Sequence, residues 1–197
     1  MRRVKMPMAA LSALLIALSA ALSASGQSKA VKSRPNPVVA LETTMGTIKV
    51  QLFATKAPIT TKNFLDYVNS GFYNGTIIHR VDFVIGLGGY TEALTAKRTR
   101  PGIKNESRNG LRNLRGTLAM ARYDNPDSAT SQFFINLKDN THLDPSGGGY
   151  GYAVFGKVIE GMQVVDSIAK VKTGNKSSFS NIPLQAIAVK SAKVVSQ

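Results

Sequence analysis

Short β-prone runs, separated by clusters of glycine, asparagine and proline, fill most of this chain and limit its possible folds more than any other feature. Within residues 46–53, Ile48, Val50 and Leu52 alternate with more polar residues, which is typical of a strand with one buried face. The other runs are residues 38–43, 76–81, 83–87, 117–121, 133–137, 153–158 and 186–195. Because so many strands accompany so few helices, the sequence predicts a mainly β domain built as a closed antiparallel barrel.

Two segments have the periodicity of helices. Pro58 opens the first, in which apolar residues recur at helical spacing until Gly71 ends it. The second, residues 162–171, follows Gly161 and has one apolar face. We expect these helices to cover the ends of the barrel. The loop between residues 90 and 116 is polar and basic, and loops of that length in compact domains tend to be functional.

The N-terminus reads as a secretory signal peptide. Residues 1–5 carry three positive charges, and an apolar run of about fifteen residues follows, shorter than the roughly 20 that span a membrane. A retained membrane anchor is the alternative, and the length of the run disfavours it. We therefore expect a signal peptide over residues 1–26, cleaved near Ala24 or Gly26, a flexible lead-in over residues 27–37, and one domain over residues 38–197. The predicted location is the periplasm or the cell exterior, with no membrane span after signal removal.

Composition excludes several classes of site. Removing residues 1–26 takes away three cations and no acid, so the formal net charge falls from +14 to +11. The remaining cations are dispersed, with no basic run and no interleaved aromatic residues, so no specific nucleic-acid binding is expected. There is no cysteine, which excludes disulfides and thiol chemistry. With two histidines and no clustered carboxylates, we predict neither a metal site nor a cofactor.

Two motifs carry the functional signal. The first is Ile78-His79-Arg80-Val81, and the second is the run over residues 116–122 followed by Ser131-Gln132-Phe133-Phe134-Ile135. Together they predict one cation facing an apolar, aromatic-lined hollow with amide donors on its rim, which suits gripping a peptide rather than cutting it. Since side chains alternate along a strand, we expect His79 to lie on the face opposite Arg80 and to be structural.

In order and spacing, these motifs resemble the cyclophilin family of peptidyl-prolyl isomerases from about residue 38 to 195, and the bacterial exported members in particular. The other motifs of the resemblance are Gly88-Gly89, Lys104-Asn105-Glu106, Gly110-Leu111-Arg112-Asn113, Leu143-Asp144 and Tyr152-Ala153-Val154-Phe155-Gly156. The resemblance implies a closed eight-stranded antiparallel β-barrel capped by two α-helices, with a substrate groove on its outer face. It also implies isomerase activity without a covalent intermediate.

Site residues follow from the resemblance position by position. Arg80 takes the place of the catalytic arginine. The substrate-binding positions are Phe83, Val84, Phe134 and Leu143 for the proline pocket, Gln132, Ala121 and Arg122 for the substrate backbone, and His142 and Tyr152 for the rim. The implied partners are unfolded or extended proline-containing polypeptides, in particular exported proteins that are folding. We expect a monomer.

The chain departs from the family's pattern next to Arg80. Two residues are missing between Val81 and Phe83, and Gly86 stands where the family has a glutamine that holds the substrate. A lost hydrogen bond costs about 0.5 to 1.5 kcal/mol, so reduced isomerase activity is expected. The alternative is a peptide-binding holdase or surface interaction module with little or no isomerase activity.

Overall fold

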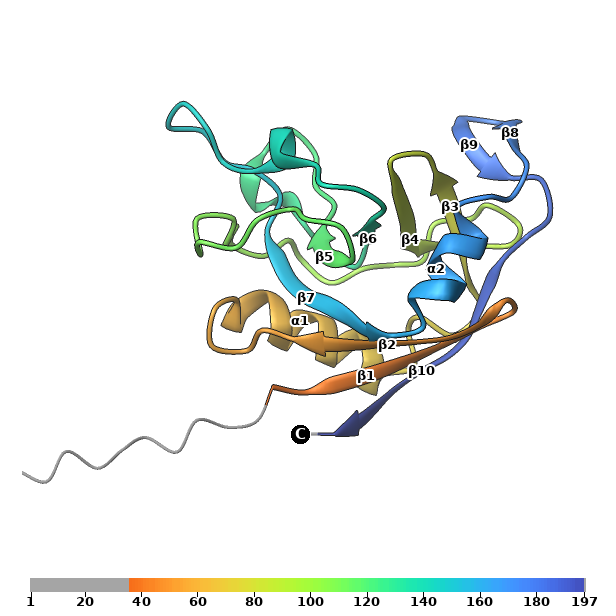
Figure 1. The fold of residues 1–197 in the computed structure, drawn as a ribbon, viewed down its shortest axis with the longest axis horizontal. Coiled ribbons are helices and arrows are strands. Elements are labelled where there is room, and N and C mark those ends of the chain that lie inside the picture. Colours follow the sequence, from red (N-terminus) through yellow and green to blue (C-terminus); the bar gives the residue numbers. More distant parts are fainter. Residues whose placement is uncertain (1–35, 197) are drawn as a thin grey trace, which may run out of the picture. The chain divides into compact units, whose positions relative to one another are not determined.

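The computed structural model describes residues 36–196 of this chain, and they form a closed antiparallel barrel (Figure 1). Its strands pair in the order β1-β10-β3-β4-β6-β5-β7-β2. The bounds are β1 (Val38–Thr43), β2 (Gly46–Leu52), β3 (Thr76–Val81), β4 (Val84–Thr91), β5 (Thr117–Met120), β6 (Phe133–Asn136), β7 (Val154–Glu160) and β10 (Ala188–Ser196). The predicted eight-stranded antiparallel barrel with two helices is confirmed.

Aromatic side chains fill the interior of the barrel. The ring of Phe64 lies 5.2 Å from the rings of Phe133 and Phe155 and 5.3 Å from that of Tyr73, and all four side chains are almost completely buried. Each such ring stabilises the fold by about 1.5 to 3 kcal/mol through the apolar surface it buries. Phe64 comes from α1 (Pro58–Asn69), so the helix and the sheet share one core.

A carboxylate from the long loop caps α1. Pro58 stands at the start of the helix, and no side chain of the preceding residues accepts from its free amides. Glu106 does so instead: Oε1 accepts from the Ile59 amide at 3.1 Å, and Oε2 accepts from the Thr60 amide at 2.8 Å and the Thr60 hydroxyl at 2.7 Å. A helix N-terminus favours negative charge, so the Glu106 carboxylate stabilises the start of α1. The same contact ties the loop after β4 to the barrel.

The second helix, α2, covers residues Met162–Ile168 and ends three residues earlier than expected. Its Val165 and Ile168 are completely buried in the core. Strand β4 continues to Thr91, past the predicted end at residue 87. Its glycines do not favour strands, but pairing with β3 and β6 holds the segment extended.

One hairpin, formed by β8 (Thr173–Lys176) and β9 (Phe179–Pro183), was not predicted from the sequence. It forms a separate two-stranded sheet, and its second strand packs against β3 (Figure 1). Residues 173–178 are polar or glycine and show no apolar alternation, so the pattern gave no signal for β8.

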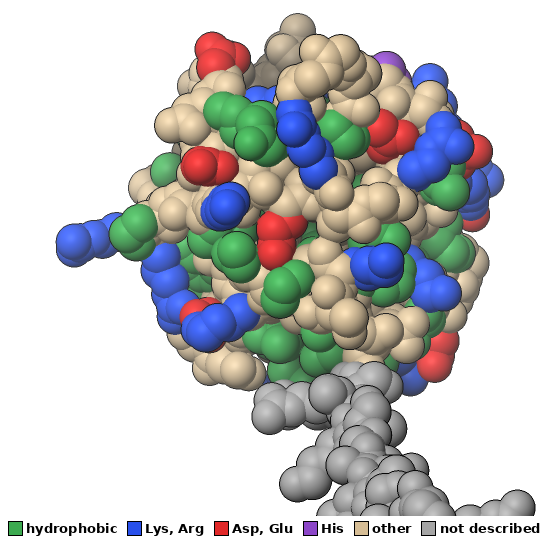
Figure 2. Space-filling view, turned by 90° about the vertical axis from the view of Figure 1, so that its left-hand side faces the viewer, with side chains coloured by type: hydrophobic (Ala, Val, Ile, Leu, Met, Phe, Trp, Pro, Cys, Tyr) green, Lys and Arg blue, Asp and Glu red, His purple; other side chains and the backbone are tan. Residues whose placement is uncertain are grey.

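The expected signal peptide, residues 1–26, and residues 27–35 of the lead-in lie outside the described residues. Between residues 36 and 196, none of the helices combines the length and apolarity that crossing a membrane would need. The space-filling view in Figure 2 shows lysine and arginine side chains spread over the visible face with acidic residues between them. On that face the cations form no continuous basic surface, as the sequence indicates.

Candidate functional site

One row of paired residues crosses five strands on the outside of the barrel. Arg80 of β3 pairs with Gly86 of β4, Gly86 pairs with Phe134 of β6, Phe134 with Ala119 of β5, and Ala119 with Val154 of β7. Directly paired residues point to the same face of a sheet, so this register places Arg80 at one end of an otherwise apolar row. The two motifs of the sequence meet in this row.

A second apolar cluster, separate from the barrel interior, surrounds that row, and we call it the socket. Its buried members are Val84, Ala119, Phe134 and Val154, and its partly buried members are Phe53, Phe83, Leu111, Ala121, Leu143 and Tyr152. The rings of Phe134 and Tyr152 meet edge to face at 5.6 Å. Leu87, which could have filled the socket, is instead buried in the barrel core. Six of the ten predicted site residues therefore lie together in the socket.

The hairpin between β3 and β4 brings Arg80 to the socket. Val81 pairs with Ile85, and only Asp82 and Phe83 connect the two strands. The turn is shorter than in the family's pattern, but a deletion of two residues keeps the alternation of side chains. Phe83 therefore still lies in the socket. The Arg80 side chain is 46% exposed, and its Cζ lies 5.2 Å from the centre of the Phe83 ring. Phe83 also contacts the predicted rim residue His142, whose ring centre lies 5.6 Å away.

The predicted position of His79 is wrong. A β-bulge between Ile78 and Arg80 sets both His79 and Arg80 opposite Gly86. A Cβ at Gly86 would lie 3.3 Å from Arg80 Cβ and 3.5 Å from His79 Nε2, so both side chains lie on the outer face. The alternation on which the prediction depended is interrupted there.

Aromatic rings enclose His79 on that face. Its ring lies 5.0 Å from the ring of Tyr90 and 6.0 Å from that of Phe179 on the unpredicted hairpin. Burial lowers the pKa of His79 from the usual 6.5 to about 4; the nearby backbone of Ile77 opposes the shift, and the charge of Arg80 adds to it. His79 is therefore neutral at pH 7 and adds no charge beside Arg80.

Buried asparagines hold the turn that carries Phe83. The Phe83 carbonyl accepts from the Leu137 amide and from Asn140 Nδ2, both at 3.2 Å. Asn140 Nδ2 also donates to Asn136 Oδ1 at 2.9 Å, and Asn136 Nδ2 donates to Asn113 Oδ1 at 3.3 Å. All three asparagines are completely buried, so this network fixes the position of the turn.

A small polar hollow of about 120 Å³ adjoins the socket. It contains the other predicted backbone-binding residues, Gln132, Ala121 and Arg122, together with Tyr90, Tyr123, Ser128 and Thr130. Arg122 lies with Cζ 5.0 Å above the Tyr152 ring and donates to the carbonyls of Tyr150, Gly151 and Tyr123. All ten predicted site residues thus lie on one outer face.

Comparison with known proteins identifies the family. The model of the family described as cyclophilin type peptidyl-prolyl cis-trans isomerase matches residues 38–194. This chain belongs to that family. Peptidyl-prolyl cis-trans isomerase A of Dickeya dadantii is 49% identical over 92% of this chain and 97% of its own length. Peptidyl-prolyl cis-trans isomerase B of Escherichia coli is 48% identical over 80% of this chain and 99% of its own.

A solved structure gives the same result. A Cryptosporidium parvum cyclophilin type isomerase, whose crystal structure was obtained in the presence of the dipeptide Ala-Pro, has a TM-score of 0.71 to this chain at 28% identity. The match covers 81% of this chain and 99% of that one. The expected enzyme class, a peptidyl-prolyl isomerase of bacterial cyclophilin type, is confirmed.

Several residues of the socket were missed from the sequence. Ala119 and Val154 belong to predicted strands, and pairing with Phe134 would have placed them had the strand order been known. Leu111 comes from the long loop, where no periodicity marks it. Asp82, which lies next to the socket, was not singled out either, yet its carboxylate pairs with Arg80 at 2.7 Å. An acid two residues after the arginine was the available signal.

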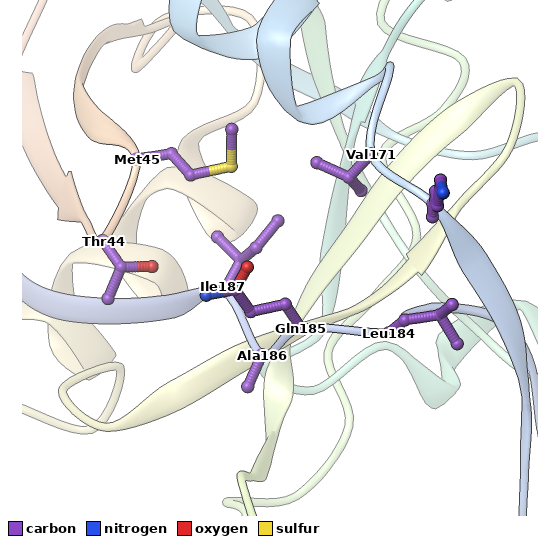
Figure 3. A pocket seen from close by; sticks show the side chains of 8 residues that line it. Thr44, Met45, Val171, Leu184, Gln185, Ala186 and Ile187 are labelled. Carbon is purple, nitrogen blue, oxygen red and sulfur yellow. The ribbon is translucent and has the colours of Figure 1, made fainter.

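A larger hollow, of about 610 Å³, lies away from these residues (Figure 3). It lies between the β1–β2 turn, the segment after α2 and the connection from β9 to β10, and the side chains of Met45 and Val171 point toward one another across it. None of the predicted site residues lines it. Over residues 36–196 there is also no group of three or more acidic or histidine side chains that could hold a metal ion.

Proposed function

We propose that Arg80 and the socket form the catalytic site of this isomerase and that its substrates are exported polypeptides that are still unfolded or extended. The observation that carries the proposal is the Arg80 guanidinium 5.2 Å from the centre of the Phe83 ring, in the row that contains Phe134. This arrangement supplies hydrogen-bond donors beside an apolar surface.

The reaction needs rotation and no bond cleavage. Amide resonance holds an X-Pro bond behind a barrier of about 18 to 20 kcal/mol, so uncatalysed exchange takes tens to hundreds of seconds. Turnover on the order of 10 to 10³ per second requires that barrier to fall by roughly 4 to 7 kcal/mol.

The chemistry of the twisted amide explains the pairing of a cation with an apolar surface. As the bond rotates, resonance is lost, the charge separation of the amide decreases and the prolyl nitrogen regains its lone pair. An apolar socket favours this less polar state over the planar one, and Arg80 can donate a hydrogen bond to that nitrogen because its guanidinium never deprotonates. Such a charge-assisted bond contributes about 1.5 to 3 kcal/mol.

The remaining stabilisation comes from holding the substrate on either side of the rotating bond. In this proposal Phe83, Val84, Phe134 and Leu143 hold the proline ring. Gln132, with the backbone at Ala121 and Arg122, holds the adjoining chain, while His142 and Tyr152 form the rim. Fixing both sides converts binding energy into a lower barrier to rotation.

We also propose that turnover is lower than in relatives with a long polar side chain at the position of Gly86. Gly86 pairs with both Arg80 and Phe134, so it lies at the centre of the row and contributes no donor or acceptor from a side chain. One missing hydrogen bond to the substrate corresponds to roughly two- to tenfold in kcat/KM.

The experiment that tests this site compares wild type with Arg80→Ala in protease-coupled turnover of an X-Pro peptide. We expect kcat/KM to fall about 10- to 100-fold. The matched control is Arg98→Ala, an exposed arginine of the long loop outside the socket, which should keep wild-type activity. Equal activity of wild type and Arg80→Ala would refute the catalytic role of Arg80.

Export rests on separate support. The N-terminal sequence has the pattern of a secretory signal, and the match to Dickeya dadantii isomerase A covers 92% of this chain, more than the part from Val38 onward. We propose a periplasmic or secreted enzyme. Fractionation of the producing cells and N-terminal sequencing test this: a mature chain beginning near Ser25 or Gln27 outside the cytoplasm is expected, and a cytoplasmic chain that keeps residues 1–26 would contradict it.

A further inference from the structure

An acidic side chain of the β3–β4 turn contacts Arg80. The residue paired with Arg80 is Gly86, which offers no side chain, and a Cβ there would lie only 3.3 Å from Arg80 Cβ. Among residues 36–196, the guanidinium has one hydrogen-bonding partner, the carboxylate of Asp82. Asp82 Oδ2 lies 2.7 Å from Nε and 2.7 Å from Nη2, so both donors along one edge of the guanidinium meet a single oxygen.

Backbone groups of Val84 hold Asp82 in place. Its other oxygen, Oδ1, accepts from the Val84 amide at 3.1 Å, and its own amide donates to the Val84 carbonyl at 3.0 Å. The Asp82 side chain is 19% exposed, compared with 46% for Arg80, so the acid is the better-fixed member of the pair. Because the turn contains only Asp82 and Phe83, the same short segment sets the anchor and the ring beneath the guanidinium.

We propose that Asp82 is a positioning residue for the isomerase reaction. It binds the Nε–Nη2 edge of Arg80 and keeps the guanidinium over Phe83 beside the socket. An arginine has five N–H donors, and the donors on Nη1 and the second donor on Nη2 stay available for the prolyl nitrogen and the substrate backbone. The inference rests on the catalytic role proposed for Arg80.

The contact with Asp82 compensates for the absence of a side chain at Gly86, the residue paired with Arg80. An unanchored arginine side chain on a half-exposed surface samples many rotamers, and ordering it again in each transition state slows the reaction. An anchor supplied by the turn removes part of that cost before the substrate binds. The effect belongs to kcat, since the substrate does not touch Asp82 in this arrangement.

The competing explanation is that Asp82 only closes the turn through the Val84 amide. A double-mutant cycle separates the two. Asp82→Ala, Arg80→Ala and the double variant are measured for kcat and KM on one X-Pro peptide, with Asp82→Asn as the conservative variant that keeps an acceptor oxygen. Thr43→Ala, in the comparable turn of the β1–β2 hairpin, controls for a loosened turn outside the site.

We expect Asp82→Ala to lower kcat about five- to tenfold with KM within twofold. Asp82→Asn should lower kcat nearly as much, because its one acceptor oxygen can close the turn on the Val84 amide but its amide nitrogen cannot accept from Arg80. In the Arg80→Ala background, Asp82→Ala should have no further effect, because there is no guanidinium left to hold. In wild type, the Arg80 Nε–H signal in a ¹H–¹⁵N NMR spectrum should be protected from exchange with water, and in Asp82→Ala that protection should be lost even if the fold is weakened.

Three results would overturn the inference. An unchanged kcat in Asp82→Ala excludes positioning. An equal loss from Asp82→Ala with and without Arg80 assigns Asp82 to the turn alone. If Arg80→Ala itself keeps full activity, the proposed function fails and this inference fails with it, whereas a loss in Arg80→Ala without one in Asp82→Ala refutes only the inference about Asp82.

Discussion

The turns of the β1–β2 and β3–β4 hairpins are closed by different side chains, a threonine in the first and an aspartate in the second. Each has a two-residue turn in which a polar side chain accepts from a free amide. In the first, Thr43 Oγ1 accepts from the Met45 amide at 3.1 Å and donates to the Gly46 carbonyl at 2.7 Å. In the second, Asp82 Oδ1 accepts from the Val84 amide at 3.1 Å. Both contacts are ordinary turn chemistry.

The two side chains differ in the hydrogen-bonding capacity that remains once the turn is closed. The Thr43 hydroxyl uses its hydrogen and a lone pair inside its own turn, whereas the Asp82 carboxylate keeps a second oxygen, which binds Arg80 at 2.7 Å. A carboxylate at a turn can therefore couple local closure of the chain to a functional cation, and a hydroxyl cannot do so to the same extent. Changes in the first hairpin are therefore expected to affect stability alone. Changes around the second hairpin are expected to affect catalysis as well, or the dependence of stability on pH.

The largest expected effect is on stability against pH, through His79 in the bulge of the second hairpin. Its pKa is lowered to about 4 in the fold, so the unfolded chain, with a pKa near 6.5, binds more protons between those values. The contribution is fully present above about pH 6.5 and is lost as the pH falls toward 4, by up to about 3 kcal/mol.

Urea unfolding at a series of pH values measures this. The variant His79→Phe, which keeps a ring between Tyr90 and Phe179, should lose less stability than wild type between pH 7 and pH 4.5. Thr43→Ala should follow the wild-type dependence on pH. Parallel curves for wild type and His79→Phe would show that the imidazole does not titrate in this range.

The next largest effect is expected from Asn140→Ala, which removes the donor to the Phe83 carbonyl and to Asn136 Oδ1. Leaving these buried acceptors with fewer partners should cost about 1 to 3 kcal/mol of unfolding free energy and raise KM, because the Phe83 turn loosens. The control is Asn175→Ala in the exposed β8–β9 hairpin. Equal stability of the two variants would contradict the role of the network.

A smaller gain is expected from Gly86→Gln. The added amide restores a polar group at the centre of the row and should raise kcat/KM about two- to tenfold. Gly86→Ala adds the Cβ without the amide and should bring no gain, since a Cβ at that position lies 3.3 Å from Arg80 Cβ and forces a small shift. A gain in Gly86→Ala equal to that in Gly86→Gln would show that shape, not hydrogen bonding, limits turnover.

The smallest effect belongs to the first hairpin. Thr43→Ala removes the two turn contacts and should cost about 0.5 to 1 kcal/mol of unfolding free energy. Isomerase kcat/KM should stay at the wild-type value, because no residue of this turn lies in the socket. A parallel loss of activity would mean that the two hairpins are coupled through the barrel.

Patterns that depend on neighbouring residues were predictable from the sequence. The alternation in residues 46–53 gives the buried face of β2, with Ile48, Val50 and Leu52 all in the core. The β3 bounds, residues 76–81, match the prediction at both ends. The proposed site residues were named as a set because their motifs resemble a family, and the structure brings all of them to one face; their roles remain a prediction.

The features that could not be predicted from the sequence depend on contacts between strands. The face of His79 follows from a bulge that exists only in the pairing of β3 with β4, and alternation within one strand cannot reveal it. The role proposed for Asp82 depends on the geometry of a two-residue turn, which places the acid against both Val84 and Arg80. The polar β8–β9 hairpin has its neighbour β3 about a hundred residues away in sequence, so no local pattern marks it.

The most direct test of the catalytic claim is magnetisation-exchange NMR on an X-Pro peptide saturated with enzyme, because it reports the interconversion rate of the bound cis and trans forms separately from binding. For Arg80→Ala, we predict that this rate falls about 10- to 100-fold while the dissociation constants of both isomers change by less than about threefold. An unchanged rate on the enzyme, with weaker binding as the only effect, would show that the guanidinium holds the substrate and does not assist rotation.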